Sequence, residues 1–187
     1  MPAFISEDDI EKTLLDRLSK FPFDYNIIKC DPSPDKRDDL NDGTFRTDKK
    51  QCVLPNVLLK KLKELNPNVQ TNQLEKFYKE VCLKDYSDDD LTSANYKLYG
   101  YIRNQKKVEF TNNDADDFDF IKLIDFDNPK NNEFTAVSQM WIKGRYYYHR
   151  PDVIVFVNGL PLIFIELKNS TVKVREAYDK NLKNYLG

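Results

Sequence analysis

Apolar side chains recur every three or four residues near the start of the chain, which is the spacing of one helix face. Ser6 and Asp9 stand at the two ends of the first turn, where each side chain can bond the backbone of the other. The pattern therefore predicts a helix from Ser6 to Lys20. The same reasoning predicts further helices over residues 54–65, 71–83 and 87–102, and a closing helix over residues 172–186.

After about residue 106 the chain changes to short runs of β-branched and aromatic residues, which predict strands. The runs 153–157 and 162–165 are apolar at every position, so we expect both of their faces to be covered. We therefore place these two strands at the centre of the sheet. The predicted strands are residues 118–126, 133–142, 146–149, 153–157 and 162–167.

This order of elements predicts an α/β (α+β) fold: a single domain over residues 1–187 with a central mixed sheet flanked by helices. Residues 31–50 are almost wholly polar and lack periodicity, which predicts a loop or a poorly ordered insertion. We expect residues 54–103 to form a helical scaffold, and residues 117–187 to form the sheet core with the closing helix.

Composition narrows the class of protein. The net charge of −2 gives no general attraction to nucleic acid, so any DNA contact must be local or shared with partners. No run of 18 apolar residues occurs, and the start lacks the layout of a secretory signal. We therefore expect a cytoplasmic protein without membrane contact.

Few side chains in this chain can carry nucleophilic or zinc chemistry. The three cysteines are far apart, and His149 is the single histidine, which argues against zinc sites, disulfide frameworks and most catalytic triads. The chemistry must come from carboxylates, lysines or metal-activated water.

Charged residues flank the two apolar runs. Asp152 precedes the first run, and Glu166-Leu167-Lys168 follows the second. Ionised groups beside an apolar sheet are costly unless they are paired or bind metal. Strand alternation places Glu166 and Lys168 on one face. A two-residue turn at Asn158-Gly159 would send Asp152 to the other face, so we expect a three-residue loop or a bulge there.

Two converging carboxylates, Asp152 and Glu166, form an oxygen-rich site suited to Mg²⁺ or Mn²⁺, with the Leu167 carbonyl as a further ligand. A metal there would lower the pKa of its bound water. Lys168 could orient the attacking hydroxide, help deprotonate the water, or stabilise charge on a phosphate, and the sequence leaves these three roles open.

The order Pro151-Asp152 followed by Glu166-x-Lys168 resembles the PD-(D/E)xK nuclease motif, although so short a pattern also occurs as a surface ion pair. The whole stretch from Arg150 to Asn169 resembles, almost residue for residue, the DNA-cleaving subunit of type I restriction-modification enzymes. Residues 123–129, 131–134 and Gln139 resemble the strands before that motif. The resemblance covers about residues 123–185.

The resemblance implies a restriction-endonuclease-like nuclease domain, a fragment of a longer subunit, acting as a type I site-specific deoxyribonuclease. Double-stranded DNA and the methylation and specificity subunits are the implied partners. ATP belongs to motor domains of the longer subunit, because no phosphate-binding loop of the Gly-x-x-x-x-Gly-Lys type occurs here. Two alternatives stay open: an autonomous nuclease, and a docking module in which residues 54–102 anchor the subunit.

Further residues are candidates for contacts with DNA. The resemblance implies a Gln-x-x-x-Tyr motif near the DNA, and Asn181 and Tyr185 stand at its positions. Asn181 is a shorter amide than the motif's Gln and departs from the pattern there, and Tyr185 can equally be a packed interface residue. Lys143, Arg145 and Arg150, interleaved with tyrosines, could grip phosphates and stack on bases, or the tyrosines could pack across strands.

For the acidic residues outside the motif we mainly expect structural or solvated positions. For Glu7 and Glu11 we expect a solvated helix face, with Glu11 the better candidate to reach the metal. The acidic run 114–119 predicts a cap or a solvated loop.

Overall fold

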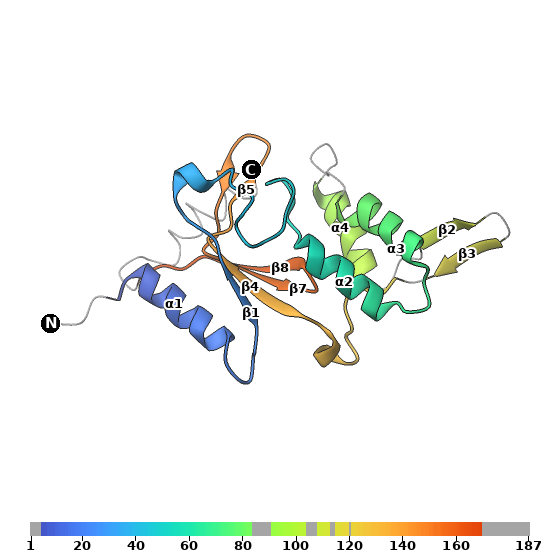
Figure 1. The fold of residues 1–187 in the computed structure, drawn as a ribbon, viewed down its shortest axis with the longest axis horizontal. Coiled ribbons are helices and arrows are strands. Elements are labelled where there is room, and N and C mark those ends of the chain that lie inside the picture. Colours follow the sequence, from blue (N-terminus) through green and yellow to red (C-terminus); the bar gives the residue numbers. More distant parts are fainter. Residues whose placement is uncertain (1–4, 84–90, 104–107, 113–114, 120, 170–187) are drawn as a thin grey trace. The chain divides into compact units, whose positions relative to one another are not determined.

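The computed structural model describes residues 5–83, 91–103, 108–112, 115–119 and 121–169 (Figure 1). The chain divides into two compact units. The first contains residues 1–52, 134–156 and 161–187, and the second contains residues 53–133 and 157–160. The described elements confirm the predicted mixed α/β fold class.

The largest sheet has the strand order β1 (Asn26–Lys29), β4 (Phe134–Ser138), β7 (Val153–Val157) and β8 (Leu160–Ile165). Strands β1 and β4 are parallel, with Asn26 opposite Thr135 and Lys29 opposite Ser138. Strands β7 and β8 follow each other through a tight turn and are therefore antiparallel. The sheet is mixed, as the sequence predicts.

Strand β8 corrects the prediction that both apolar strands are central. Residues Val153 to Phe156 of β7 are buried, but β8 is the last strand of the described sheet and its side chains at 162, 163 and 164 are 42–52% exposed. A continuous apolar run identifies a strand, but its place in the sheet depends on which segments pair with it.

Helix α1 (Glu7–Leu18) begins as predicted, because Ser6 and Asp9 form the reciprocal capping box. The Ser6 hydroxyl accepts a 3.1 Å hydrogen bond from the Asp9 N–H, which satisfies one of the free donors of the first turn. On the other face of the helix, Leu15 is buried with Ala136 and Val153 of the sheet. The first unit therefore packs α1 against the sheet (Figure 1).

The second unit confirms the predicted helices. It contains α2 (Pro55–Leu65), α3 (Thr71–Phe77), a π-helical turn (Tyr78–Cys82) and α4 (Leu91–Ile102). Leu58, Leu62, Leu74 and Phe77 form the centre of its core. The predicted cap at residues 87–90 and the closing helix at 172–186 lie outside the described residues. Among the helices that are described, none is long and apolar enough to cross a membrane.

The predicted strand 118–126 is wrong in its second half. Strand β3 (Ala115–Asp119) pairs antiparallel with β2 (Val108–Asn112), so the acidic run forms a strand where we expected a cap or a loop. Residues 121–126 are irregular, because the Asn66 side chain bonds both the N–H and the carbonyl of Lys122 in place of a neighbouring strand. Ile121 and Leu123 are buried, which is why the pattern resembled a strand.

The connection between β7 and β8 contradicts the predicted three-residue loop. Only Asn158 and Gly159 lie between the strands, with φ of 51° and 81°, as in the tight turns that suit β-hairpins. The fully buried Asn158 side chain accepts from the Glu133 N–H and donates to the Leu123 carbonyl. A Cβ atom on Gly159 would lie 2.7 Å from the Leu54 carbonyl oxygen, so only glycine fits there.

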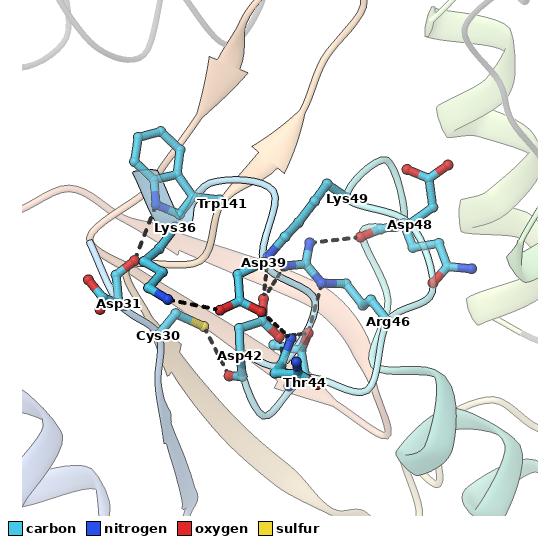
Figure 2. Close-up of polar contacts among 12 residues, drawn as sticks. Cys30, Asp31, Lys36, Asp39, Asp42, Thr44, Arg46, Asp48, Lys49 and Trp141 are labelled. Atoms are coloured by element: carbon cyan, nitrogen blue, oxygen red, sulfur yellow. Dashed lines mark hydrogen bonds and ion pairs between the residues drawn. The ribbon is translucent and has the colours of Figure 1, made fainter. Parts of the chain in front are cut away.

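Residues 31–50 contain little regular structure beyond a short 3₁₀ turn (Pro34–Lys36), in agreement with the predicted loop. However, the segment is held by buried charges. We call Asp42, Thr44, Arg46 and Lys49 the Asp42 cluster; Figure 2 shows the two cations directed at the Asp42 carboxylate. The hydrogen-bonding capacity of polar side chains therefore orders a segment that has no apolar periodicity.

Candidate active site

Asp152 lies directly before β7, and its carboxylate reaches the segment that follows β8. Its Oδ2 atom accepts a 2.6 Å hydrogen bond from the Leu167 N–H, the peptide nitrogen between Glu166 and Leu167. The residue before β7 and the backbone of the segment after β8 therefore meet in space. They do so despite the two-residue turn, because Asp152 and Glu166 lie outside β7 and β8, where strand alternation no longer sets the direction of side chains.

Gln139, directly after β4, contacts Asp152 through its main chain and its side chain. Its N–H donates to the Asp152 carbonyl at 3.0 Å. Its side-chain amide donates to Glu11 Oε2 at 2.5 Å and makes a longer contact of 3.5 Å with Asp152 Oδ1. Gln139 thus connects an acid of α1 with the acid that precedes β7.

The two glutamates of α1 lie against this region, although we expected a solvated face. Glu7 and Glu11 are four residues apart and therefore share a helix face, and both are half-buried. Glu7 Oε2 lies 3.6 Å from Lys168 Nζ, and Glu7 Oε1 accepts from the Asn169 N–H at 3.3 Å. We call Glu7, Glu11, Gln139, Asp152, Glu166 and Lys168 the Asp152 site; all six belong to the first compact unit.

The donors of the Asp152 site fit a hard divalent cation. Asp152 and Glu11 bring carboxylate oxygens, which such cations prefer, to half-buried positions at the Gln139 amide. Within the described part of the chain, no ion pair joins Asp152 or Glu11 to Lys or Arg, and no group of three His, Cys, Asp or Glu side chains is arranged to hold a metal ion. The described contacts thus bring two carboxylates, those of Asp152 and Glu11, to one amide.

Thiol chemistry is disfavoured in the described chain. Burial raises the pKa of Cys30 to about 12 and that of Cys82 to about 12, so both thiols stay protonated near neutral pH. Cys52 is exposed and lies on the irregular segment before α2. Burial therefore disfavours thiolate chemistry at Cys30 and Cys82.

The stretch between Gln139 and Asp152 forms a hairpin of β5 (Ile142–Lys143) and β6 (Tyr148–His149). Tyr148 is engaged within it: its hydroxyl donates to Asp38, and its ring faces the Lys143 ammonium at 5.9 Å. Tyr146 and Tyr147, at the tip, are each 76% exposed. Cross-strand packing therefore accounts for Tyr148 alone among the three tyrosines.

The three cations proposed as DNA contacts differ in their surroundings. Arg150 donates to the Pro32 carbonyl at 2.6 Å and stacks on the Trp141 ring, so it fastens the hairpin to the segment after β1. Arg145 lies over the ring of the exposed Tyr146 at the tip. Asn181 and Tyr185, the other two predicted contacts, lie outside the described residues.

The sequence pattern predicts no role for Gln139 and a solvated position for Glu7. Both residues reach the site through contacts that join distant parts of the chain, Glu11 to Gln139 and Glu7 to Asn169. The one available signal was the i, i+4 spacing of the two glutamates, which places them on one face but does not say what that face meets.

The chain is a mixed α/β domain in which the Gln139 amide joins an acid of α1 to the acid that precedes β7. A family model described as "Type I restriction enzyme R protein N terminus" matches residues 4–186. The chain belongs to this family.

Two curated relatives cover most of this chain. The type I restriction enzyme HindI endonuclease subunit of Haemophilus influenzae is 33% identical over 177 residues, which is 94% of this chain and 16% of that protein. The putative type I restriction enzyme MjaIXP endonuclease subunit of Methanocaldococcus jannaschii is 30% identical over 174 residues, 89% of this chain and 16% of that protein. The chain thus spans about a sixth of the length of these relatives.

Proposed function

We propose that this chain is the Mg²⁺-dependent DNA endonuclease domain of a type I restriction subunit and hydrolyses phosphodiester bonds. The observation that carries the proposal is the hydrogen bond from the Leu167 N–H to Asp152, which joins the two halves of the acidic motif. Membership of the R-subunit family supports it, as do the names of the relatives, which are endonuclease subunits.

Asp152 and Glu166 are the proposed metal ligands, with the Leu167 carbonyl as a third donor and Glu11 as a further acid. When bound, Mg²⁺ (or Mn²⁺) would acidify the attacking water and offset negative charge on the phosphate. The Leu167 N–H orients the Asp152 carboxylate, because it occupies Oδ2, while the contact of Oδ1 among the described residues is the long one with Gln139.

Lys168 is the proposed catalytic cation. Its ammonium lies 3.6 Å from Glu7, and its side chain is 24% exposed, so it is held at the site and yet open to a phosphate group. Charge stabilisation at the scissile phosphate, or orientation of the attacking water, fits this position. Glu7 would then keep Lys168 extended toward the site.

DNA contacts are proposed at the β5–β6 hairpin. Residues 141–150 contain Lys143, Arg145 and Arg150 and no acid, in a chain whose net charge is −2. Arg145 with the exposed Tyr146 and Tyr147 would meet the nucleic acid directly, whereas Arg150 would act through the hairpin it holds. Asn181 and Tyr185 remain further proposed contacts.

Partners follow from the longer subunit. The proposed complex contains double-stranded DNA and the methylation and specificity subunits, and ATP would act through motor domains elsewhere in the subunit. These assignments are proposals for a chain that spans 16% of its relatives.

The test is DNA cleavage by the assembled enzyme carrying Asp152→Ala, Glu166→Ala or Lys168→Ala. Each substitution should lower the cleavage rate by at least about 10²-fold without loss of the fold, because it removes a group that acts on the transition state. Asp16→Ala is the matched control, since Asp16 is an acid of α1 that pairs with Lys20 away from the site. Retained cleavage in the three site variants would refute the proposal and leave a docking role.

A further inference from the structure

Gln139 has an unusual backbone for its residue type. Its φ is +56°, in the left-handed region that glycine and asparagine favour. A strained conformation at a longer side chain persists only where the surroundings hold it, and such positions gather at functional sites. Here the Gln139 N–H bonds the Asp152 carbonyl at 3.0 Å, which fixes Gln139 beside Asp152.

The side-chain amide of Gln139 contacts two acids at once. An amide nitrogen carries two N–H donors, whereas an ionised carboxylate only accepts. The Nε2 atom lies 2.5 Å from Glu11 Oε2 and 3.5 Å from Asp152 Oδ1, so one neutral group connects two anionic ones. Glu11 comes from α1 and Asp152 from the residue before β7, and Gln139 bridges these elements.

A neutral side chain that bridges two acids differs from a cationic one in the negative charge that remains on the acids. A lysine at this position would neutralise the acids and compete with a divalent cation for the same oxygens. An amide holds the acids near each other and leaves their negative charge in place. Asp152 is also held at its other oxygen by the Leu167 N–H at 2.6 Å, so the carboxylate is restrained from two directions.

We infer that Gln139 is a positioning residue for the proposed nuclease reaction: its amide bridges Glu11 and Asp152 and orients them for a divalent cation. This inference rests on the proposed function and adds to it a residue outside the acidic motif. Groups that orient metal ligands through hydrogen bonds contribute about 10- to 100-fold to metal affinity.

The test measures Mn²⁺ binding to the full subunit by calorimetry, together with the Mg²⁺ dependence of cleavage by the assembled enzyme. Gln139→Ala should raise the Mn²⁺ dissociation constant about tenfold and shift the Mg²⁺ requirement equally, while cleavage at saturating Mg²⁺ falls by less than about threefold. Gln139→Lys keeps donors but adds a cation, so it should weaken Mn²⁺ binding further.

Gln139→Gly distinguishes the contribution of the side-chain amide from that of the backbone conformation. Glycine accepts a positive φ without strain, so this variant keeps the backbone path and lacks only the side chain. It should lose as much Mn²⁺ affinity as Gln139→Ala. If the alanine variant unfolds, the glycine variant still allows the measurement. Gln51→Ala is the matched control, because the Gln51 amide bonds Thr47 outside the site.

The outcomes separate the two proposals. If Asp152→Ala loses Mn²⁺ binding but Gln139→Ala and Gln139→Gly keep the wild-type dissociation constant within twofold, the role of Gln139 is overturned and the nuclease proposal stands. If Asp152→Ala cleaves DNA like the wild type, the nuclease proposal fails and the role of Gln139 fails with it.

Discussion

Two groups of charged side chains lie in the first compact unit, the Asp42 cluster and the Asp152 site, and they differ in how their acids are compensated. Asp42 Oδ2 accepts from Arg46 at 2.8 Å and from Lys49 at 2.7 Å (Figure 2). The described donors to Asp152 are instead the neutral Leu167 N–H and the Gln139 amide. One acid thus meets two cations, and the other meets none in the described residues.

The Asp42 cluster is also more deeply buried than the Asp152 site. The side chains of Arg46, Lys49 and Asp42 are 0%, 4% and 8% exposed, while the residues of the Asp152 site are half-buried. Burial alone would raise the pKa of Asp42, but hydrogen bonds from Lys49, Thr44 and Arg46 outweigh it and lower the pKa to about 2.

Under the proposed function, the difference separates the structural role of the Asp42 cluster from the chemical role proposed for the Asp152 site. Charges that the chain itself compensates can be sealed from water, and they then contribute to the order of the fold. Acids that the chain only orients, and leaves open to solvent, retain the capacity to bind an external cation. The role of a charge cluster is therefore inferred from whether cations of the same chain compensate its acids, more than from the number of acids.

The largest change in stability is expected for Asp42→Asn. The variant leaves Arg46 and Lys49 buried without an anion, which should lower the free energy of unfolding by about 4 kcal/mol. Urea denaturation measures this loss. Asp39→Asn, on the partly exposed ion pair with Lys36, should change it by no more than about 0.5 kcal/mol. A loss below about 1 kcal/mol for Asp42→Asn would contradict a structural role for the cluster.

Lowering the pH should protonate the Asp42 carboxylate and so remove its stabilising contribution. Its pKa is about 2 in the folded chain against the ordinary value of 3.8, so the unfolded chain binds the proton more readily. The stabilisation is therefore present above pH 4 and is lost as the pH falls toward 2, by about 2 kcal/mol. Denaturation curves from pH 5 to pH 2 test this, and the decrease should be smaller in Asp42→Asn. Equal slopes in both proteins would assign acid sensitivity to other groups.

Lys49→Met should have a smaller effect, because Asp42 keeps Arg46 and Thr44 as donors. The substitution also changes the net charge of the cluster from +1 to 0. We expect a loss of about 1 kcal/mol in the free energy of unfolding. Measured beside Asp42→Asn, an equally large loss would show that Lys49, and not Arg46, supplies most of the compensation.

The smallest change in stability is expected at the Asp152 site. Asp152→Asn keeps an acceptor for the Leu167 N–H and removes a negative charge near Glu11, so the free energy of unfolding should stay within about 0.5 kcal/mol. Cleavage by the assembled enzyme should nevertheless fall by at least about 10²-fold. A loss of stability as large as that of Asp42→Asn would mean that Asp152 has a structural role, and the comparison would fail.

Local patterns in the sequence predicted local structure well. The Ser6–Asp9 capping box predicted the start of α1, and apolar spacing predicted α2 and α3. Asn158-Gly159 is a strong signal for a two-residue turn, and the structure contains that turn. Our preference for a longer loop came from extending strand alternation to Asp152 and Glu166, which lie beyond the strands.

Long-range pairing accounts for the errors. Strand β1 was missed because its four residues carry little pattern of their own and are a strand through their pairing with β4. Residues 121–126 were assigned to a strand because they are apolar, but the Asn66 side chain takes the place of a strand partner.

The sequence by itself determined the helices, the apolar runs of β7 and β8, and the acidic motif at their ends, because these depend on neighbours within a few residues. Only the tertiary structure decided that Glu7 and Glu11 face the motif, that Gln139 bridges two acids, and that Arg46 and Lys49 compensate Asp42. Contacts such as that of Glu11 with Gln139 join residues far apart in the chain, and short-range periodicity carries no information about them.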